Sequence, residues 1–181
     1  IKFINKTNKK GIVALHYASF KGNIEIIHLL LEKGADIKIS TKKSLNVLHF
    51  SCQGNKPNSL TYYRYFHKNE IGLEDEDSAQ STPLHWACYS SAAECVTYLL
   101  FWGVNINCKD KDGNTPLHLA ILGGSLRIVR ILLQNGASSK IKNNKNETVF
   151  QLAHNKKRKD IYDLLSSNQK CNLCNFKTPV K

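Results

Sequence analysis

Four similar segments recur along this chain at a nearly constant interval. They begin ALHYASFKG (14–22), VLHFSCQG (47–54), PLHWACYSS (83–91) and PLHLAILGG (116–124), so the shared histidine steps by 33, 36 and 33 residues. A unit of this length is too small to bury its own apolar face, so each copy must stack on its neighbours. We therefore expect a row of repeated units and not a single central core.

The residues at the start of each segment predict a helix. Threonine stands directly before proline at 82–83 and again at 115–116. Threonine can cap a helix, and proline suits the first helical position because its missing N–H would have no partner there. Asn46 and Thr148 can cap the equivalent helices, whereas Val13 cannot, so the first helix is expected to start less sharply.

A second helix is expected to follow in each unit. Apolar residues recur there every three or four positions, which is typical of one buried helical face. These residues are Ile24, Ile27, Leu30 and Leu31; Cys95, Val96, Leu99 and Leu100; and Leu126, Val129, Leu132 and Leu133. A glycine then follows, at Gly34, Gly103 and Gly136, and is expected to end the helix in the left-handed conformation.

The segment DKDGNTPLHLAILGGSLRIVRILLQNGA (110–137) resembles the ankyrin repeat almost position for position. The resemblance implies an all-α ankyrin-repeat solenoid of about five helix-turn-helix repeats with β-turn tips. Phe150 and Gln151 replace the Leu-His of the other copies, and this more polar last copy suits a terminal cap. We expect an N-terminal extension (1–8), repeats over 9–41, 42–74, 78–110 and 111–143, a capping repeat over 144–165, and a basic cysteine-containing tail or linker over 166–181.

In the ankyrin family the first helices and the turn tips line a concave face that binds polypeptides. The resemblance therefore implies a protein or peptide ligand on that face. On the first helices the expected contacts are Trp86, Tyr89, Phe20, Lys21, Gln53 and Leu122. At the turn tips they are Lys9, Lys10, Lys42, Asp77, Asp110 and Asp112.

Trp86 and Tyr89 stand out among these contacts because both are larger than the scaffold requires. Large amphipathic side chains commonly carry much of the binding energy of an interface. We expect these two residues to anchor the bound segment.

One pair of residues in this region has the composition of a reactive site. His85 and Cys88 lie three residues apart on one predicted helix, a spacing at which they can touch and form a nucleophile. However, the histidine occupies the slot shared by all four copies, and Cys88 matches Cys52 and Ser19 at a position that needs a small residue. In ankyrin repeats this histidine is structural and binds backbone in the adjacent turn. We expect no active site and no cofactor.

A metal site is not expected either. Cys171-x-x-Cys174 supplies half of a zinc knuckle, and two further ligands at suitable spacing are absent before Lys181. The remaining cysteines fall at small apolar positions of the repeat, which favours free thiols in a reducing compartment.

The net charge of +12 is concentrated at the two ends of the chain. Residues 1–50 carry 9 Lys or Arg against 3 acids, and residues 136–181 carry 10 against 3. Such ends can attract nucleic acid or anionic lipid. They lack the arginines and interleaved aromatics that nucleic-acid surfaces favour, so we expect no nucleic-acid partner.

Repeat two is the irregular one, with three extra residues. Its acidic run at 74–77 is interpreted as a solvated turn, with a docking site for a basic partner as the alternative. Its aromatics at 62, 63, 65 and 66 are expected mostly in the core. Phe101 and Trp102 fit two interpretations equally: packing against this enlarged repeat, or an exposed partner patch.

A second resemblance concerns the parent protein. VLHFSCQGNKPNSLTYYRYF (47–66), the STPLHWACYSS segment (81–91) and the KTPVK tail (177–181) are similar to the ankyrin-containing subfamily of Asp-His-His-Cys type protein S-acyltransferases, or palmitoyltransferases. That resemblance implies that the array lies on the cytosolic face of an endomembrane and recruits substrate proteins. Apart from it, we expect a monomeric, cytoplasmic array that does not itself insert into the membrane. The alternative is a soluble ankyrin adaptor or scaffold with no enzymatic domain.

Overall fold

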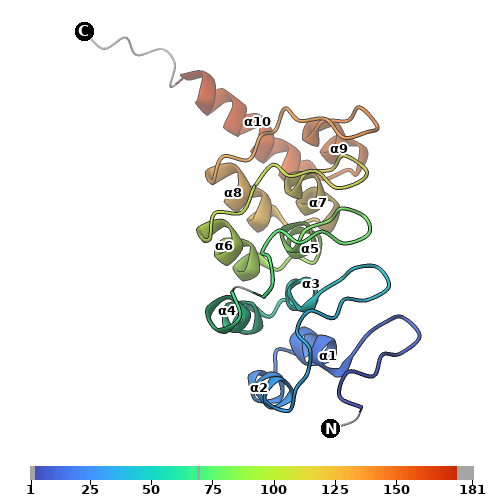
Figure 1. The fold of residues 1–181 in the computed structure, drawn as a ribbon. Coiled ribbons are helices and arrows are strands. Elements are labelled where there is room, and N and C mark those ends of the chain that lie inside the picture. Colours follow the sequence, from blue (N-terminus) through green and yellow to red (C-terminus); the bar gives the residue numbers. More distant parts are fainter. Residues whose placement is uncertain (1–2, 69, 175–181) are drawn as a thin grey trace.

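The computed structural model describes residues 3–68 and 70–174, and in these residues the chain forms ten helices in five consecutive pairs (Figure 1). The shorter first helices are α1 (Ala14–Lys21), α3 (Val47–Gln53), α5 (Pro83–Tyr89), α7 (Pro116–Gly123) and α9 (Val149–Asn155). Their partners are α2 (Ile24–Glu32), α4 (Pro57–Phe66), α6 (Ala93–Phe101), α8 (Leu126–Gln134) and α10 (Lys159–Cys174).

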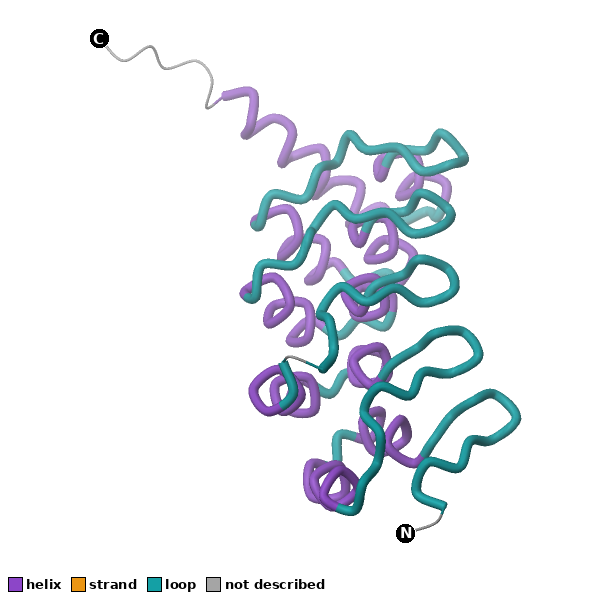
Figure 2. The backbone as a smooth tube through the Cα atoms, viewed as in Figure 1, coloured by secondary structure: helices purple, strands orange, loops and turns teal. Residues whose placement is uncertain are grey.

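The five pairs stack side by side into two columns of helices. The first helices form one column and the second helices form the other, and the loops between pairs project beyond the first helices as a row of hairpins (Figures 1 and 2). The expected all-α repeat solenoid is confirmed. In the following text, the inner face is the side of the first helices and hairpins, and the outer face is the side of the second helices.

The repeated histidine ties each repeat to the next. The Nδ1 atom of His85 accepts a hydrogen bond from the backbone N–H of Thr82 (3.1 Å), which leaves its Nε2 atom to donate to the carbonyl of Asn114 in the following hairpin (3.2 Å). His49 donates to Ser81 and His118 to Glu147 in the same way, at 3.1 and 3.3 Å. The structural role predicted for this histidine is confirmed.

The first repeat is the exception in this series. The Nδ1 atom of His16 accepts from the backbone of Val13 at 3.2 Å, but its buried Nε2 atom has no hydrogen-bond partner. The side chain packs instead against Phe50, with ring centroids 4.7 Å apart. The last repeat uses Gln151 in the same slot, where its Oε1 atom accepts from the Thr148 N–H at 2.8 Å.

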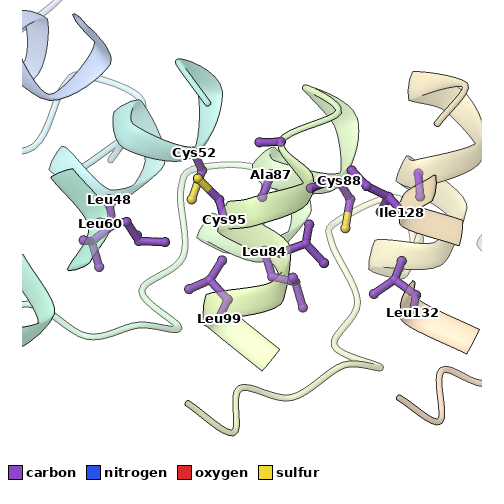
Figure 3. Packing of buried hydrophobic residues seen from close by; sticks show 14 of the residues in the cluster. Leu48, Cys52, Leu60, Leu84, Ala87, Cys88, Cys95, Leu99, Ile128 and Leu132 are labelled. Carbon is purple, nitrogen blue, oxygen red and sulfur yellow. The ribbon is translucent and has the colours of Figure 1, made fainter. Parts of the chain in front are cut away.

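The core runs continuously through the stack, between the two columns of helices. Cys52 of α3 and Cys95 of α6 point toward one another across the boundary between repeats two and three (Figure 3). Both are fully buried among leucines, like Cys88, and all three are free thiols. These cysteines therefore act as small buried residues of the core, as predicted.

The glycines that follow the second helices have positive φ, as predicted. Gly34, Gly103 and Gly136 have φ of 89°, 79° and 86°. Helix α10 continues through Cys174 and so extends into the segment expected as a tail or linker. The side chains of Cys171 and Cys174 lie outside the described part of the structure, as do residues 175–181.

Repeat two divides its aromatic residues between core and surface. Tyr63 is 1% exposed, and its hydroxyl group hydrogen-bonds to the hydroxyl group of Ser19 at 2.6 Å. Tyr65 and Phe66, in contrast, are 70% and 71% exposed. In repeat three Trp102 is half-buried and stacks on Tyr98, whereas Phe101 is exposed. Trp102 also lies against repeat two, with the Arg64 guanidinium 5.9 Å from its ring centre, so the packing interpretation holds for Trp102.

Candidate functional site

Each hairpin is folded around one polar side chain that lies in the same place in every repeat. In repeat three this is Asp77, whose Oδ1 atom accepts from the backbone N–H groups of Ala79 (2.8 Å) and Ser81 (2.9 Å). In repeat four Asp110 accepts from Asp112 and Asn114 in the same pattern. Asn8, Thr41 and Asn143 do so in the other hairpins.

Neighbouring hairpins are joined at their tips by single backbone hydrogen bonds. The N–H of Lys42 donates to the carbonyl of Lys10, and the N–H of Lys111 donates to the carbonyl of Ala79. Equivalent bonds run from Ser78 to Lys43 and from Asn144 to Asp112. The tips therefore form a continuous edge along the inner face.

The two anchor residues predicted from the sequence line one small hollow on this face. The hollow has a volume of about 120 Å³, lies between repeats three and four, and is mostly apolar. Tyr89 is 56% exposed at its rim, and Trp86 is half-buried. The remaining lining comes from Ser81, His85 and Leu119.

Trp86 is held in place by its own hairpin. Its indole Nε1–H donates to the Oδ2 atom of Asp77 at 2.9 Å, so the Asp77 carboxylate accepts three hydrogen bonds in all. Asp77 is 8% exposed, and both of its carboxylate oxygens are engaged. Asp77, one of the contacts expected at the turn tips, thus holds Trp86 in its orientation.

A second, larger hollow lies next to the first, between repeats four and five. Its volume is about 320 Å³, and two predicted contacts, Asp112 and Leu122, line it. Its other residues are mainly polar, and they include Asn114, Asn143 and Glu147, which bind one another through side-chain hydrogen bonds. Because Leu119 and Leu122 both belong to α7, the two hollows share a wall.

The remaining predicted contacts lie further along the inner helices, in repeats one and two. Phe20 is half-buried under the ammonium of Lys21, which lies 5.8 Å from the ring centre, and Gln53 is exposed at the end of α3. None of these three lines either hollow. The lysines expected at the tips, Lys9, Lys10 and Lys42, are all exposed.

Three residues that line the first hollow, Ser81, His85 and Leu119, are not among the contacts expected from the sequence, and the repeat period contains a signal for Leu119. Leu119 lies 33 residues after Trp86 and so occupies the same inner-face slot one repeat later. Ser81 lies in the return arm of the hairpin that carries Asp77.

The thiols and histidines of this region are in their neutral forms. Burial raises the pKa of Cys88 well above its ordinary value and lowers the pKa of His85. Cys108, the nearest sulfur to the imidazole, lies 3.8 Å from its Nδ1 atom, and burial raises the pKa of this thiol too. A buried neutral thiol is a poor nucleophile, so His85 and Cys88 serve as parts of the scaffold.

Within residues 3–68 and 70–174, no three His, Cys, Asp or Glu side chains lie close enough together to hold a metal ion. No helix of that part of the chain has the length and apolar character needed to cross a membrane.

Comparison of this sequence with known proteins assigns the chain to a family. The family model described as "Ankyrin repeats (3 copies)" matches residues 15–110 and 94–175. Human transient receptor potential cation channel subfamily A member 1 is 34% identical over 113 residues, which is 60% of this chain and 10% of that protein. Alpha-latrotoxin-Lhe1a of Latrodectus hesperus is 34% identical over 85 residues, and human inversin is 29% identical over 111 residues.

These last two matches cover 46% and 61% of this chain, against 6% and 10% of the relatives. The chain thus spans a tenth or less of the curated relatives described above, so they bear on the repeats alone. Since the family model covers most of the chain, the chain belongs to the ankyrin-repeat family.

Proposed function

We propose that this array binds an extended polypeptide segment along its inner face, with an apolar side chain of the ligand seated in the hollow formed by Trp86, Tyr89 and Leu119. The observation that carries the proposal is the convergence of these three side chains on one apolar hollow. Its volume of about 120 Å³ matches one aliphatic side chain in size and is too small for a folded surface element.

The two aromatic residues have different tasks in this arrangement. Trp86 is fixed by its bond to Asp77, so its ring is already oriented before a ligand arrives. A preorganised side chain loses little conformational entropy on binding. Tyr89 has more than half of its surface open to solvent and gains the most from being covered.

Replacing Tyr89 with alanine tests the proposal. We expect Tyr89→Ala to weaken binding of a selected peptide by roughly 2 kcal/mol, or about 30-fold, as is typical of an interface anchor. The unfolding midpoint should change little, because the side chain is largely exposed. Peptides for this test can be selected from a displayed library, and affinity measured by fluorescence anisotropy.

Tyr65→Ala provides a matched control. Tyr65 is 70% exposed but lies on α4, in the outer column of helices. It should leave peptide affinity unchanged. Equal losses from the two substitutions, or no loss from Tyr89→Ala, would contradict binding at this hollow.

For the parent protein we propose the cellular role that its resemblance to the ankyrin-containing acyltransferases implies. In that role the array is the cytosolic part of a membrane-bound protein S-palmitoyltransferase and recruits its substrates on an endomembrane. The family match accommodates a soluble cytoplasmic adaptor equally well. The full-length transcript decides between them: apolar spans of about 20 residues and an Asp-His-His-Cys motif downstream of Lys181 support the acyltransferase, and their absence refutes it.

A further inference from the structure

The hairpin tips of repeats one and two carry positive charge, and neither tip contains an acidic residue. Four exposed lysines, Lys9, Lys10, Lys42 and Lys43, form the tips of the first two hairpins, and we call them the lysine edge. The backbone bond between Lys42 and Lys10 holds the two tips together at 3.1 Å.

The acids of these repeats all lie elsewhere. The three acids within residues 1–50 are Glu25 and Glu32, both on the outer helix α2, and Asp36, which follows that helix. Within the described residues, the single pair of a basic and an acidic side chain closer than 4.0 Å is His67 and Glu70. The lysine edge therefore has no carboxylate of residues 3–68 or 70–174 at salt-bridge distance.

The acids nearest to the edge lie at the border with repeat three, where the Ser78 N–H donates to the Lys43 carbonyl, and among the described residues none of these acids lies within 4.0 Å of a lysine ammonium. Asp75 accepts hydrogen bonds from Asn46 and Gly72, and Asp77 is occupied as described above. Glu76, between them, is exposed and marks where the positive surface ends. A negative group of a ligand is thus attracted to repeats one and two more than to repeat three.

The lysine edge and the apolar hollow belong to the same inner face. On the basis of the proposed function, we infer that the bound polypeptide carries acidic residues that lie against the lysine edge while its apolar side chain fills the hollow at Trp86. Lysines interact with carboxylates as flexible point charges and need no fixed fork geometry, so a run of Asp or Glu in an extended chain satisfies them.

The spacing of the repeats sets the spacing within the ligand. Packed helices lie about 8–10 Å apart, and an extended chain advances about 3.3 Å per residue. The hollow lies between repeats three and four, and the lysine edge lies one and a half to two and a half repeats away. The acidic residues should therefore lie about four to eight residues from the apolar one.

A displayed library of random 16-residue peptides tests this inference, with selection on the wild-type chain and on two double variants. Lys10→Glu with Lys43→Glu reverses the charge of the lysine edge. Lys33→Glu with Lys68→Glu makes the same change in charge at exposed positions that follow the outer helices α2 and α4. All four residues are exposed, so both variants should fold, and circular dichroism verifies this.

We expect peptides selected on the wild type to carry Asp or Glu four to eight residues from an apolar residue. Their affinity should fall about tenfold in ~0.05 M salt for the Lys10/Lys43 variant and stay unchanged for the Lys33/Lys68 variant. Peptides without acidic residues, or acidic peptides that bind both variants equally, overturn the inference. The proposed function survives that result if Tyr89→Ala still weakens the same peptides.

Two other outcomes count against specific parts of the proposal. If no selected peptide depends on Tyr89, or if no peptide is recovered, the proposed function itself fails. If a labelled 20-nucleotide single-stranded DNA binds as tightly as the acidic peptides and loses affinity in the Lys10/Lys43 variant, the edge is a general polyanion surface. That result overturns an acidic polypeptide as its occupant.

Discussion

The buried histidines make this fold sensitive to mild acid, and His16 provides the sharpest test. Burial lowers the pKa of His16 to about 4, from 6.5 in an exposed histidine. As the pH falls below 6.5, the unfolded chain takes up a proton that the folded chain refuses, so stability is lost between pH 6.5 and 4. Burial also lowers the pKa values of His49, His85 and His118, so the same sign holds for each.

The magnitude for His16 follows from these values. At pH 7.5 the side chain is neutral in both states and costs almost nothing. At pH 5.5, one unit below the pKa of the unfolded state and above that of the folded state, its contribution to the free energy of unfolding has dropped by about 1.4 kcal/mol. The chain supplies a suitable replacement, because Gln151 already occupies the same slot in repeat five and accepts the equivalent backbone N–H.

Urea unfolding of His16→Gln, followed by circular dichroism at pH 7.5, 6.5 and 5.5, is the assay. Relative to the wild type, the variant should gain about 1.4 kcal/mol of stability between pH 7.5 and 5.5. His154→Gln, at an exposed position, is the control and should leave the pH dependence unchanged. If the wild type and His16→Gln lose stability in parallel over this range, burial of His16 does not cause the loss of stability in acid.

The remaining predictions concern the positioning of the site. Asp77→Ala removes the acceptor of three hydrogen bonds and should lower the free energy of unfolding by about 2–4 kcal/mol, whereas Asp112→Ala, at an exposed tip, should change it by no more than about 0.5 kcal/mol. Chemical denaturation measures both, and similar small effects would show that the Asp77 bonds contribute little. Gly123→Ala should cost about 1–3 kcal/mol, because its Cβ would lie 2.5 Å from the carbonyl oxygen of Tyr89. An unchanged denaturation midpoint would mean that α5 and α7 can separate without cost.

The sequence predicted the fold because its signal was periodic. One histidine slot, recurring every 33 or 36 residues, was enough to define the repeats, and the structure confirms the bond from this histidine to the next hairpin. The period also placed Trp86 and Tyr89 on the inner face, where both line one hollow.

The role of Asp77 and the exposure of the aromatic residues of repeat two depend on contacts between individual side chains, which the repeat pattern does not contain. Asp77 was taken for a ligand contact because its position at a turn tip was known but its hydrogen bonds were not. The hint was that Asn8, Thr41, Asp77, Asp110 and Asn143 all place an acceptor oxygen in one hairpin slot, which indicates a structural role. The exposure of Tyr65 and Phe66 could not be read from the pattern, because repeat two breaks the period in that region.

The most direct test of ligand binding on the inner face uses the chain's 2 tryptophans, which lie on opposite faces of the array. Trp86 belongs to the inner helix α5, and Trp102 follows the outer helix α6, where it stacks on Tyr98. Titration of a ¹⁵N-labelled chain with a library-selected peptide should shift the indole N–H signal of Trp86 and leave that of Trp102 in place. A shift confined to Trp102 would place the ligand on the outer face and contradict the account.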